Sequence, residues 1–169
     1  MLIVRKELEE YRLGGAANVA ANLAALGLTT ELIGVVGRDA AADKLRTMLR
    51  ERGVEVSGLV AGSVATPTKT RVLAGATGTA KQQVLRIDEE PEVYSASSSD
   101  QVAAALQERS ASSDAVVISD YGLGSVGERT MELATRLSAE GQVVCVDSRY
   151  RLGKFRDVTV ITPNAPEAE

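Results

Sequence analysis

The chain has 169 residues, of which 44% are hydrophobic, 25% charged and 3% aromatic, a composition typical of one globular domain with a sizeable core. A net charge of −4 with scattered Lys and Arg argues against nucleic-acid binding. With no apolar run of membrane-spanning length and no signal peptide, we expect a cytoplasmic protein that does not enter membranes. The absence of His excludes His-based catalysis, which leaves carboxylates, amides, hydroxyls and cations, a repertoire that suits phosphate and sugar chemistry with a divalent metal.

Hydrophobic periodicity predicts helices that alternate with strands. In chain order, the expected elements are strand 2–4, helix 16–26, strand 31–36, helix 40–52, extended segment 54–60, strands 68–74 and 82–88, helix 100–109, strand 115–118, helix 127–139, strand 142–146, strand 158–161 and a helix that starts at Asn164. This alternation indicates an α/β fold with a mostly parallel sheet covered by helices on both faces. The strands on either side of residues 75–81 do not fit that layer, and we expect them to form a small β lid over about residues 66–90. The single Cys145 is expected to be a buried strand residue.

Carboxylates stand at the ends of three predicted strands, where ligands gather in open α/β sheets. They belong to Asp39, Asp120 and Asp147, each at the end of an apolar run. Three of them at one edge of the sheet would form a polar site. Asp is also frequent in loops and at helix starts, so each one alone has an ordinary structural explanation.

The strongest local motif is the pair Gly14-Gly15, followed by Asn18 at the start of the first predicted helix. Paired glycines let the backbone approach a ligand, and the N-terminus of a helix presents N–H groups. Asn18 and Asn22 lie one turn apart on one face, where their amides can bond sugar hydroxyls. A tight turn followed by a polar stripe facing solvent would explain the same residues. A dinucleotide-binding fingerprint is a poor alternative, because the third glycine of G-x-G-x-x-G is missing.

Cations gather on the predicted lid. Lys69 and Arg71 are two residues apart and share a face of the first strand, which Arg86 on the second strand could join. Such a cluster suits a phosphate, although an edge strand protected by charge is an alternative explanation. Apolar positions such as Val72 and Val84 would allow the lid to pair with a second copy, which predicts a homodimer through the lid.

The C-terminal segment contains Asn164 and, three residues later, Glu167. This spacing is that of a helix-capping box, with Pro166 in the first turn, and the spacing alone favours the cap. The same pair could also hold water around a Mg²⁺ ion near nucleotide phosphates. The last predicted helix stops at Glu169 after barely one turn, so we expect a chain that is cut rather than finished.

Considered together, these motifs resemble the signatures of the ribokinase (PfkB) family of sugar kinases. The segments that carry the resemblance, in the family's order, are 11–27, 66–71, 82–88, 119–122 and 162–167. Their amino-acid sequences are similar to those of the heptose 7-phosphate kinase branch, the kinase half of the enzymes that make ADP-heptose for bacterial lipopolysaccharide. The resemblance covers nearly the whole chain and implies a ribokinase-like fold.

The resemblance implies transfer of the γ-phosphoryl group of ATP to the anomeric hydroxyl of heptose 7-phosphate, with Mg²⁺ as cofactor. The residues that it places near the sugar or its phosphate are Gly14, Gly15, Asn18, Lys69, Arg71, Arg86 and Asp120, and those that it places at the nucleotide phosphates are Asn164 and Glu167. Of these, Glu167 would hold the metal through water. Two rivals stay open: a kinase for another substrate, such as ribose, fructose 1-phosphate or adenosine, and a non-catalytic module that binds sugar phosphates.

The chain also departs from the family pattern. The family's strand with a sugar-binding Asp has no counterpart ahead of Met1, and the G-A-G-D motif, whose Asp is the general base, is absent from the sequence. The resemblance therefore implies a partial kinase domain over residues 1–169, with the base expected beyond Glu169 and no activity of the chain alone. Leu123 stands where a Lys is expected, which puts one phosphate contact in doubt, and Ser148 stands where a Pro is expected.

Overall fold

The computed structural model describes residues 5–75, 80–90 and 95–165. Its elements, in chain order, are α1 (Gly15–Ala25), β1 (Thr30–Glu31), β2 (Gly34–Val36), α2 (Ala40–Arg50), β3 (Val54–Glu55), β4 (Leu59–Ala61), β5 (Thr68–Ala74), β6 (Gln82–Glu89), α3 (Ala96–Ser110), β7 (Ala115–Asp120), α4 (Glu128–Ala139), β8 (Val143–Ser148), the 3₁₀ turn η1 (Leu152–Lys154) and β9 (Val160–Ile161). The predicted strand 2–4 and most of the predicted C-terminal helix lie outside the described residues. Among those residues, no helix is long and apolar enough to cross a membrane.

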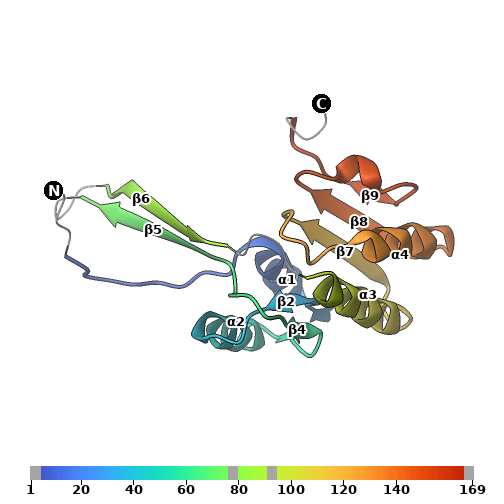
Figure 1. Ribbon diagram of the computed structural model, residues 1–169, viewed down its shortest axis with the longest axis horizontal. Coiled ribbons are helices and arrows are strands. Elements are labelled where there is room, and N and C mark those ends of the chain that lie inside the picture. Colours follow the sequence, from blue (N-terminus) through green and yellow to red (C-terminus); the bar gives the residue numbers. More distant parts are fainter. Residues whose placement is uncertain (1–4, 76–79, 91–94, 166–169) are drawn as a thin grey trace.

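The body of the molecule is built from parallel strands with helices packed against them (Figure 1). Strand β1 pairs with β3, β2 pairs with β4, and β7, β8 and β9 form one sheet in that order. Helices α1 and α2 share an apolar cluster with β3, whereas α3 and α4 pack over β7 and β8. The predicted α/β fold with a mostly parallel sheet is thereby confirmed.

One face of the β7–β9 sheet is less covered than the sequence predicted. Burial alternates along β7 and β8, because successive side chains point to opposite faces. The buried set lies under α3 and α4, while Val117, Val143 and Val160 on the strands are 44–45% exposed. Cys145 is a strand residue, as predicted, but is only half-buried. The face of this sheet under α3 and α4 is therefore buried to a greater extent than the opposite face.

Side-chain caps explain where two of the helices begin. Asp39 caps α2 by accepting a 2.8 Å hydrogen bond from the N–H of Ala42, so that α2 starts where it was predicted. Ser95 caps α3 in the same way, accepting from the N–H of Ser98 at 3.3 Å. Helix α3 therefore starts four residues before the predicted helix 100–109, since the serine-rich segment expected to be a polar connection forms its first turn.

Two predicted strands are divided in the structure. The segments 31–36 and 54–60 were each expected to be continuous, but they form β1 and β2, and β3 and β4. The pairing is interrupted because two residues separate Glu31 from Gly34, whereas three residues separate their partners Glu55 and Leu59. Gly58 lies in this irregular stretch, and a Cβ there would be 2.8 Å from the Ile33 Cγ1 atom. Strand β7 is longer than predicted and ends at Asp120, which the sequence had placed in a loop.

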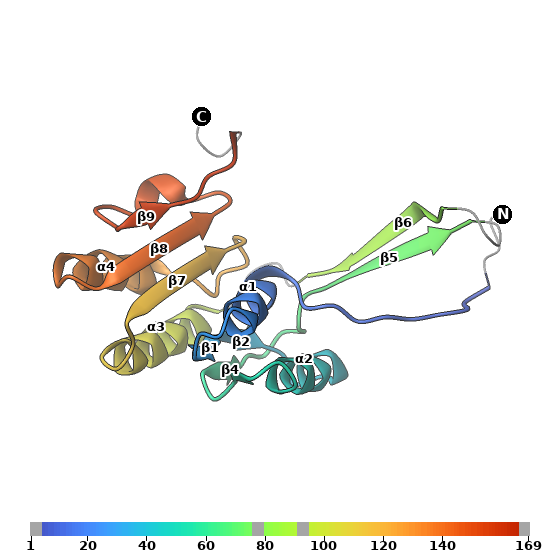
Figure 2. The same cartoon turned by 180° about the vertical axis from the view of Figure 1, so that it is seen from behind.

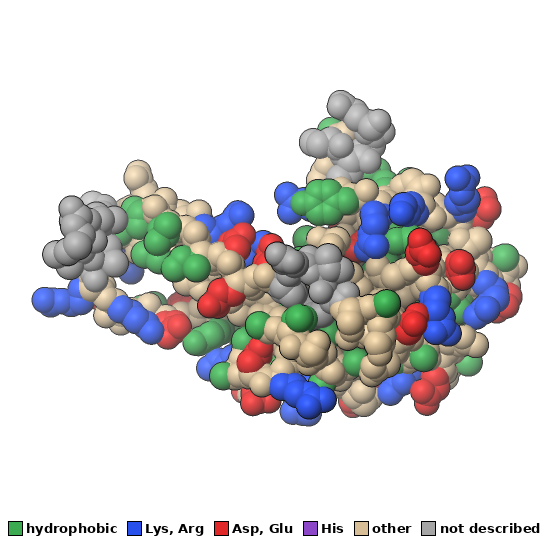
Figure 3. Space-filling view, in the orientation of Figure 1, with side chains coloured by type: hydrophobic (Ala, Val, Ile, Leu, Met, Phe, Trp, Pro, Cys, Tyr) green, Lys and Arg blue, Asp and Glu red, His purple; other side chains and the backbone are tan. Residues whose placement is uncertain are grey.

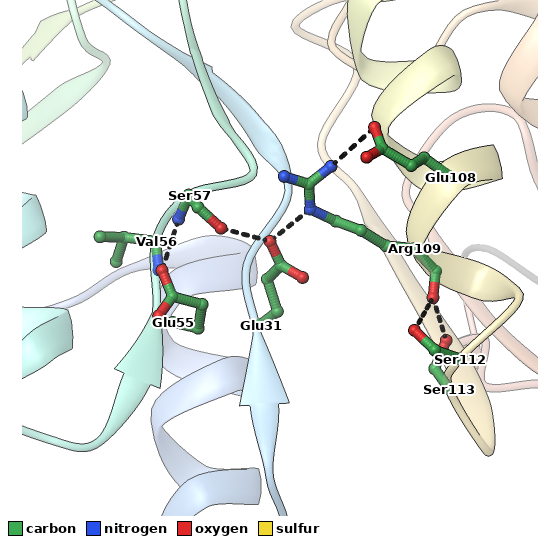
Figure 4. A network of polar contacts seen from close by, with 8 residues as sticks. All are labelled: Glu31, Glu55, Val56, Ser57, Glu108, Arg109, Ser112 and Ser113. Carbon is green, nitrogen blue, oxygen red and sulfur yellow. Dashed lines mark hydrogen bonds and ion pairs between the residues drawn. The ribbon is translucent and has the colours of Figure 1, made fainter.

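An ion-pair network ties the C-terminal end of α3 to the neighbouring β1 strand (Figure 4). The Nε of Arg109 donates to the Oε1 of Glu31 at 2.6 Å, and both side chains are about a quarter exposed at 28% and 26%. The same carboxylate oxygen accepts from the Oγ of Ser57 at 3.0 Å. These bonds hold α3 against the edge formed by β1 and the turn after β3.

The predicted lid is present as the antiparallel hairpin β5–β6, which projects away from the body (Figures 1 and 2). Its strands span 68–74 and 82–89, within one residue of the prediction. Apolar side chains are visible on its surface in Figure 3. Those that are 46–53% exposed are Leu73, Val84, Leu85 and Ile87. The lid therefore carries apolar surface that the body of this chain does not cover.

The register of the hairpin gathers the lid cations on one face. Lys69 lies opposite Asp88 and Arg71 lies opposite Arg86, so that the three predicted lid cations share one face. The other face carries Thr70, Val72, Leu85 and Ile87. A bulge follows Val72 and shifts the register near the tip. The predicted position of Arg86 on the same face as Lys69 and Arg71 is confirmed.

Candidate active site

The carboxyl ends of β7, β8 and β9 meet at a hollow of about 320 Å³. The residues that line it are Asp120, Tyr121, Asp147, Arg149, Thr162 and Asn164. Two of the three predicted strand-end carboxylates are therefore brought together, and Asn164 joins them. The side chains offer oxygen atoms and one guanidinium, a set that suits phosphate groups and a hard cation.

The third carboxylate, Asp39, lies elsewhere and has a structural role, contrary to the prediction of three carboxylates in one site. Its Oδ2 accepts from the N–H of Thr66 at 2.7 Å and its Oδ1 from the Thr66 hydroxyl at 2.8 Å, in addition to its cap of α2. Burial alone would raise the pKa of Asp39, but these hydrogen bonds outweigh it and hold the pKa below its usual value. Asp39 thereby joins the start of α2 to the segment that leads into the lid. It also borders a second hollow of about 570 Å³, which is lined by none of the predicted sugar or nucleotide residues.

The Gly14-Gly15 turn opens α1 beside the end of β7. Gly15 has a φ of +52°, a backbone conformation that favours glycine, and a Cβ there would lie 3.5 Å from the ring of Tyr121. Gly14 has a φ of −123°. A Cβ added to Gly14 would meet nothing within 4 Å among the described residues. Asn18, one turn further along, is exposed. Within the described residues no side chain caps α1, in contrast to α2 and α3.

Two of the lid cations, Lys69 and Arg86, form ion pairs on the hairpin, and Lys69, Arg71 and Arg86 are not among the described residues that line the strand-end hollow. Lys69 bonds to Glu90 and to Asp88, the latter at 3.2 Å. The hydrogen bond to Glu90 is the largest of the contacts that raise the pKa of Lys69, so that this ammonium group stays charged. The Nε of Arg86 pairs with Asp88 at 2.9 Å. The structure therefore places Lys69, Arg71 and Arg86 together on the lid and apart from Asp120.

The structure describes only one of the two residues predicted to bind the nucleotide phosphates and the metal. Asn164 lines the hollow, whereas Glu167 lies outside the described residues. Within the ranges that the structure describes, no three acidic, His or Cys side chains gather in a way that would hold a metal ion by themselves. The oxygen-bearing side chains at the hollow still fit Mg²⁺, because this ion usually keeps several waters and takes one or two carboxylates together with phosphate oxygens.

Sequence reasoning missed the cluster around Arg151. This guanidinium binds the buried carboxylate of Asp120, while Arg149 lines the hollow and lies 5.4 Å from the ring centroid of Tyr150. The sequence placed these residues only in the connection between the predicted strands 142–146 and 158–161. The available signal was the position of two arginines directly after the end of a buried strand, where a charged side chain can turn back toward a carboxylate on the neighbouring strand.

Comparison of the sequence with known proteins identifies one family. The model of the pfkB family carbohydrate kinases matches residues 2–169. The bifunctional protein HldE of Citrifermentans bemidjiense is 40% identical over 171 residues, an alignment that covers 99% of this chain and 34% of that protein. The D-beta-D-heptose 7-phosphate kinase of Bordetella bronchiseptica is 37% identical over 166 residues, covering 98% of this chain and 51% of the kinase. The chain thus spans about a third to a half of these relatives.

Solved structures give the same fold at lower identity. A possible 1-phosphofructokinase from Thermotoga maritima superposes with a TM-score of 0.73 at 21% identity, covering 98% of this chain and 53% of that one. The tetrameric inhibited form of phosphofructokinase-2 from Escherichia coli gives a TM-score of 0.66 at 22% identity, covering 96% and 56%. A sugar kinase from Pyrococcus horikoshii in complex with ATP gives 0.59 at 20% identity, covering 91% and 51%.

Proposed function

This chain belongs to the pfkB family of carbohydrate kinases, and we propose that it forms part of a kinase that transfers the γ-phosphoryl group of ATP to the anomeric hydroxyl of heptose 7-phosphate. The name of the relative at 37% identity, a D-beta-D-heptose 7-phosphate kinase, supports this substrate. The resemblance of the motifs to the heptose 7-phosphate kinase branch supports a role in ADP-heptose synthesis for lipopolysaccharide. A cytoplasmic setting, where ATP is available, agrees with it. Since the chain spans only part of these relatives, the activity, substrates and partners of the whole protein belong to the proposal.

The observation that carries the proposal is the glycine at position 14. Its backbone angles are open to any residue, and a Cβ there would meet no atom of the described residues within 4 Å. Gly14 is the N-cap of α1, where Gly, Ser, Thr, Asn and Asp are all favoured, so the start of the helix does not by itself select a glycine. A ligand that approaches the backbone does. We propose that the sugar lies against Gly14 and Gly15, with Asn18 bonding its hydroxyls and Tyr121 beside the turn.

At the nucleotide end, the proposal assigns the phosphates of ATP to the strand-end hollow. Arg149 supplies positive charge there, and Asn164 together with Glu167 would hold the waters of Mg²⁺. The metal ion would neutralise phosphate charge, and the chain's own residues would orient the two substrates, since phosphoryl transfer depends mainly on positioning and charge stabilisation. The chain has no G-A-G-D motif. We therefore propose that the 169 residues alone do not complete the reaction and that the general base comes from beyond Glu169.

Separate calorimetric titrations with heptose 7-phosphate and with Mg·ATP distinguish the kinase from a non-catalytic module that binds sugar phosphates. We expect the protein to bind both ligands, because the proposed contacts of the sugar are the Gly14 turn and the lid, whereas those of ATP lie in the strand-end hollow. Sugar-phosphate binding without any response to Mg·ATP would instead support the non-catalytic binding module. Tighter binding of ribose, fructose 1-phosphate or adenosine than of heptose 7-phosphate would move the proposal to a kinase for that substrate.

The substitution Lys69→Ala in a complete kinase domain is expected to weaken heptose 7-phosphate binding by about tenfold while leaving ATP binding within about twofold. The reason is that Lys69 stays charged on the cationic face of the lid, which the proposal brings to the sugar phosphate. Lys81→Ala serves as a matched control, since Lys81 is an exposed lysine near the tip of the same hairpin. Equal losses of both ligands in Lys69→Ala would show that Lys69 has a structural role only.

We also propose that two copies of the protein pair through the apolar face of the lid. Leu85 and Ile87 are 52% and 47% exposed on the face opposite the cations, and pairing would remove them from water. Light scattering is expected to give the mass of a dimer, which Ile87→Lys should shift to that of a monomer. A monomer at high concentration in the unsubstituted protein would contradict the proposal.

A further inference from the structure

The carboxylate of Asp120 is the most deeply buried acidic group at the candidate site. Its side chain is only 2% exposed and forms a two-point pair with Arg151, whose Nη2 lies 2.7 Å from Oδ1 and whose Nε lies 3.1 Å from Oδ2. A buried carboxylate is tolerated only when its oxygens are well paired. A guanidinium in this fork geometry meets that demand, so the contact is built into the fold.

Further donors complete the coordination of this carboxylate. The N–H of Gly122 donates to Oδ1 at 3.0 Å and the hydroxyl of Ser148 donates to Oδ2 at 2.8 Å. Both oxygens of Asp120 thus accept two hydrogen bonds from within the chain. Arg151 also reaches the carbonyl oxygen of Val126 at 2.8 Å, and its own N–H donates to the Ser148 hydroxyl at 3.2 Å. A substrate would find this carboxylate already occupied.

These bonds fasten together the two loops that form the walls of the hollow. The first loop, after β7, carries Tyr121, whose ring lies against Gly15. The second loop, after β8, carries Arg149 and Tyr150, and the Tyr150 ring is so close to Gly122 that a Cβ there would lie 2.7 Å from it. The position of the sugar-side tyrosine and that of the phosphate-side arginine therefore both depend on the contact between Asp120 and Arg151.

We propose that Asp120, Ser148 and Arg151 are positioning residues, here called the Asp120 clamp, which act on bound substrates through Tyr121 and Arg149. The inference rests on the proposed function for the identity of the ligands, and it replaces direct contact between Asp120 and the substrate with an indirect role. Ser148 is essential to it, because its hydroxyl bonds both partners of the pair. The proline that the family resemblance led us to expect at this position has neither a hydroxyl nor an N–H.

A double-mutant cycle with Asp120→Asn, Arg151→Gln and the combined variant tests the clamp by two readouts. The first is the pair of nuclear Overhauser effects from the Tyr121 ring to Gly15 Hα and from the Tyr150 ring to Gly122 Hα. The second is the dissociation constant for heptose 7-phosphate and for Mg·ATP by calorimetry. The matched control is Asp100→Asn with Arg129→Gln, since that pair lies at 3.4 Å but is 49% and 61% exposed.

The clamp predicts that both Overhauser effects weaken in all three variants and persist in the control. Each single variant should bind both ligands about tenfold more weakly, and the combined variant should bind no more weakly than either single one, since paired residues that act as a unit are not additive. Unchanged Overhauser effects, or losses that add in the combined variant, would overturn the clamp. If the unsubstituted protein binds neither ligand, the proposed function fails, while the Overhauser effects still decide whether the clamp exists. Circular dichroism checks that each variant is folded.

Discussion

Replacing Gly37 by Ala is expected to lower the free energy of unfolding by about 3 kcal/mol, because the new methyl group would clash with the hydrogen-bonded atoms around it. A Cβ at this position would lie 2.4 Å from the Oδ2 of Asp39, and 2.8 Å from both the Thr66 nitrogen and the Val64 carbonyl oxygen. Two of these atoms bond each other, and the Gly37 N–H itself donates to the Thr66 hydroxyl at 2.9 Å. The methyl group would therefore break the connection between β2, the cap of α2 and the lid.

Gly34→Ala is the matched control for this prediction. Gly34 begins β2, which ends one residue before Gly37, and a Cβ there meets nothing within 4 Å among the described residues. Its substitution is expected to change stability by less than about 1 kcal/mol. Urea unfolding of both variants measures the difference. Similar losses in the two variants would mean that the joint around Asp39 does not hold the lid to the body as we describe.

The substitution Gly14→Ala is expected to weaken heptose 7-phosphate binding by between about tenfold and a hundredfold, because the methyl group would hold the sugar away from the backbone and remove contacts there, and each loss of about 1.4 kcal/mol weakens binding tenfold. Stability should stay within about 0.5 kcal/mol, because the site has room for the methyl group and an ordinary φ. Calorimetry and urea unfolding together separate the two effects.

Gly15→Ala serves as the comparison, because it is expected to lower stability as well. Its φ of +52° is strained for alanine, so this variant is expected to lose about 1 kcal/mol of stability in addition to any loss of binding. If Gly14→Ala binds heptose 7-phosphate as well as the unsubstituted protein does, the sugar does not lie against this turn. The observation that carries the proposed function would then be lost.

Features set by local patterns were predictable from the sequence. The lid hairpin followed from two alternating strands around a glycine-containing turn, and its register confirms that Lys69, Arg71 and Arg86 share a face. Helix α4 starts within one residue of its prediction, because its apolar stripe is regular. The family itself was recognisable from short motifs in order, and the family comparison over residues 2–169 agrees.

Features that depend on contacts between distant residues were not predictable in this way. Asp39 looked like a member of the strand-end site, but Thr66, 27 residues further on, supplies the donors that give it a structural role. The pairing of Asp120 with Arg151 also joins two separate loops, and no local pattern reports which carboxylate a guanidinium will reach. Hydrophobic periodicity indicates which face of a helix or strand is buried. It does not indicate which polar side chains meet at the end of that element.

We propose that this chain belongs to a kinase acting on heptose 7-phosphate, and phosphoryl transfer to that sugar can be measured directly. A complete kinase domain containing this chain would be incubated with Mg·ATP and heptose 7-phosphate and followed by ³¹P nuclear magnetic resonance. We expect a new anomeric phosphate signal that appears together with ADP, and no such signal with the 169 residues alone. Conversion of ATP with ribose, fructose 1-phosphate or adenosine but not with heptose 7-phosphate, or no transfer to any of them, would contradict it.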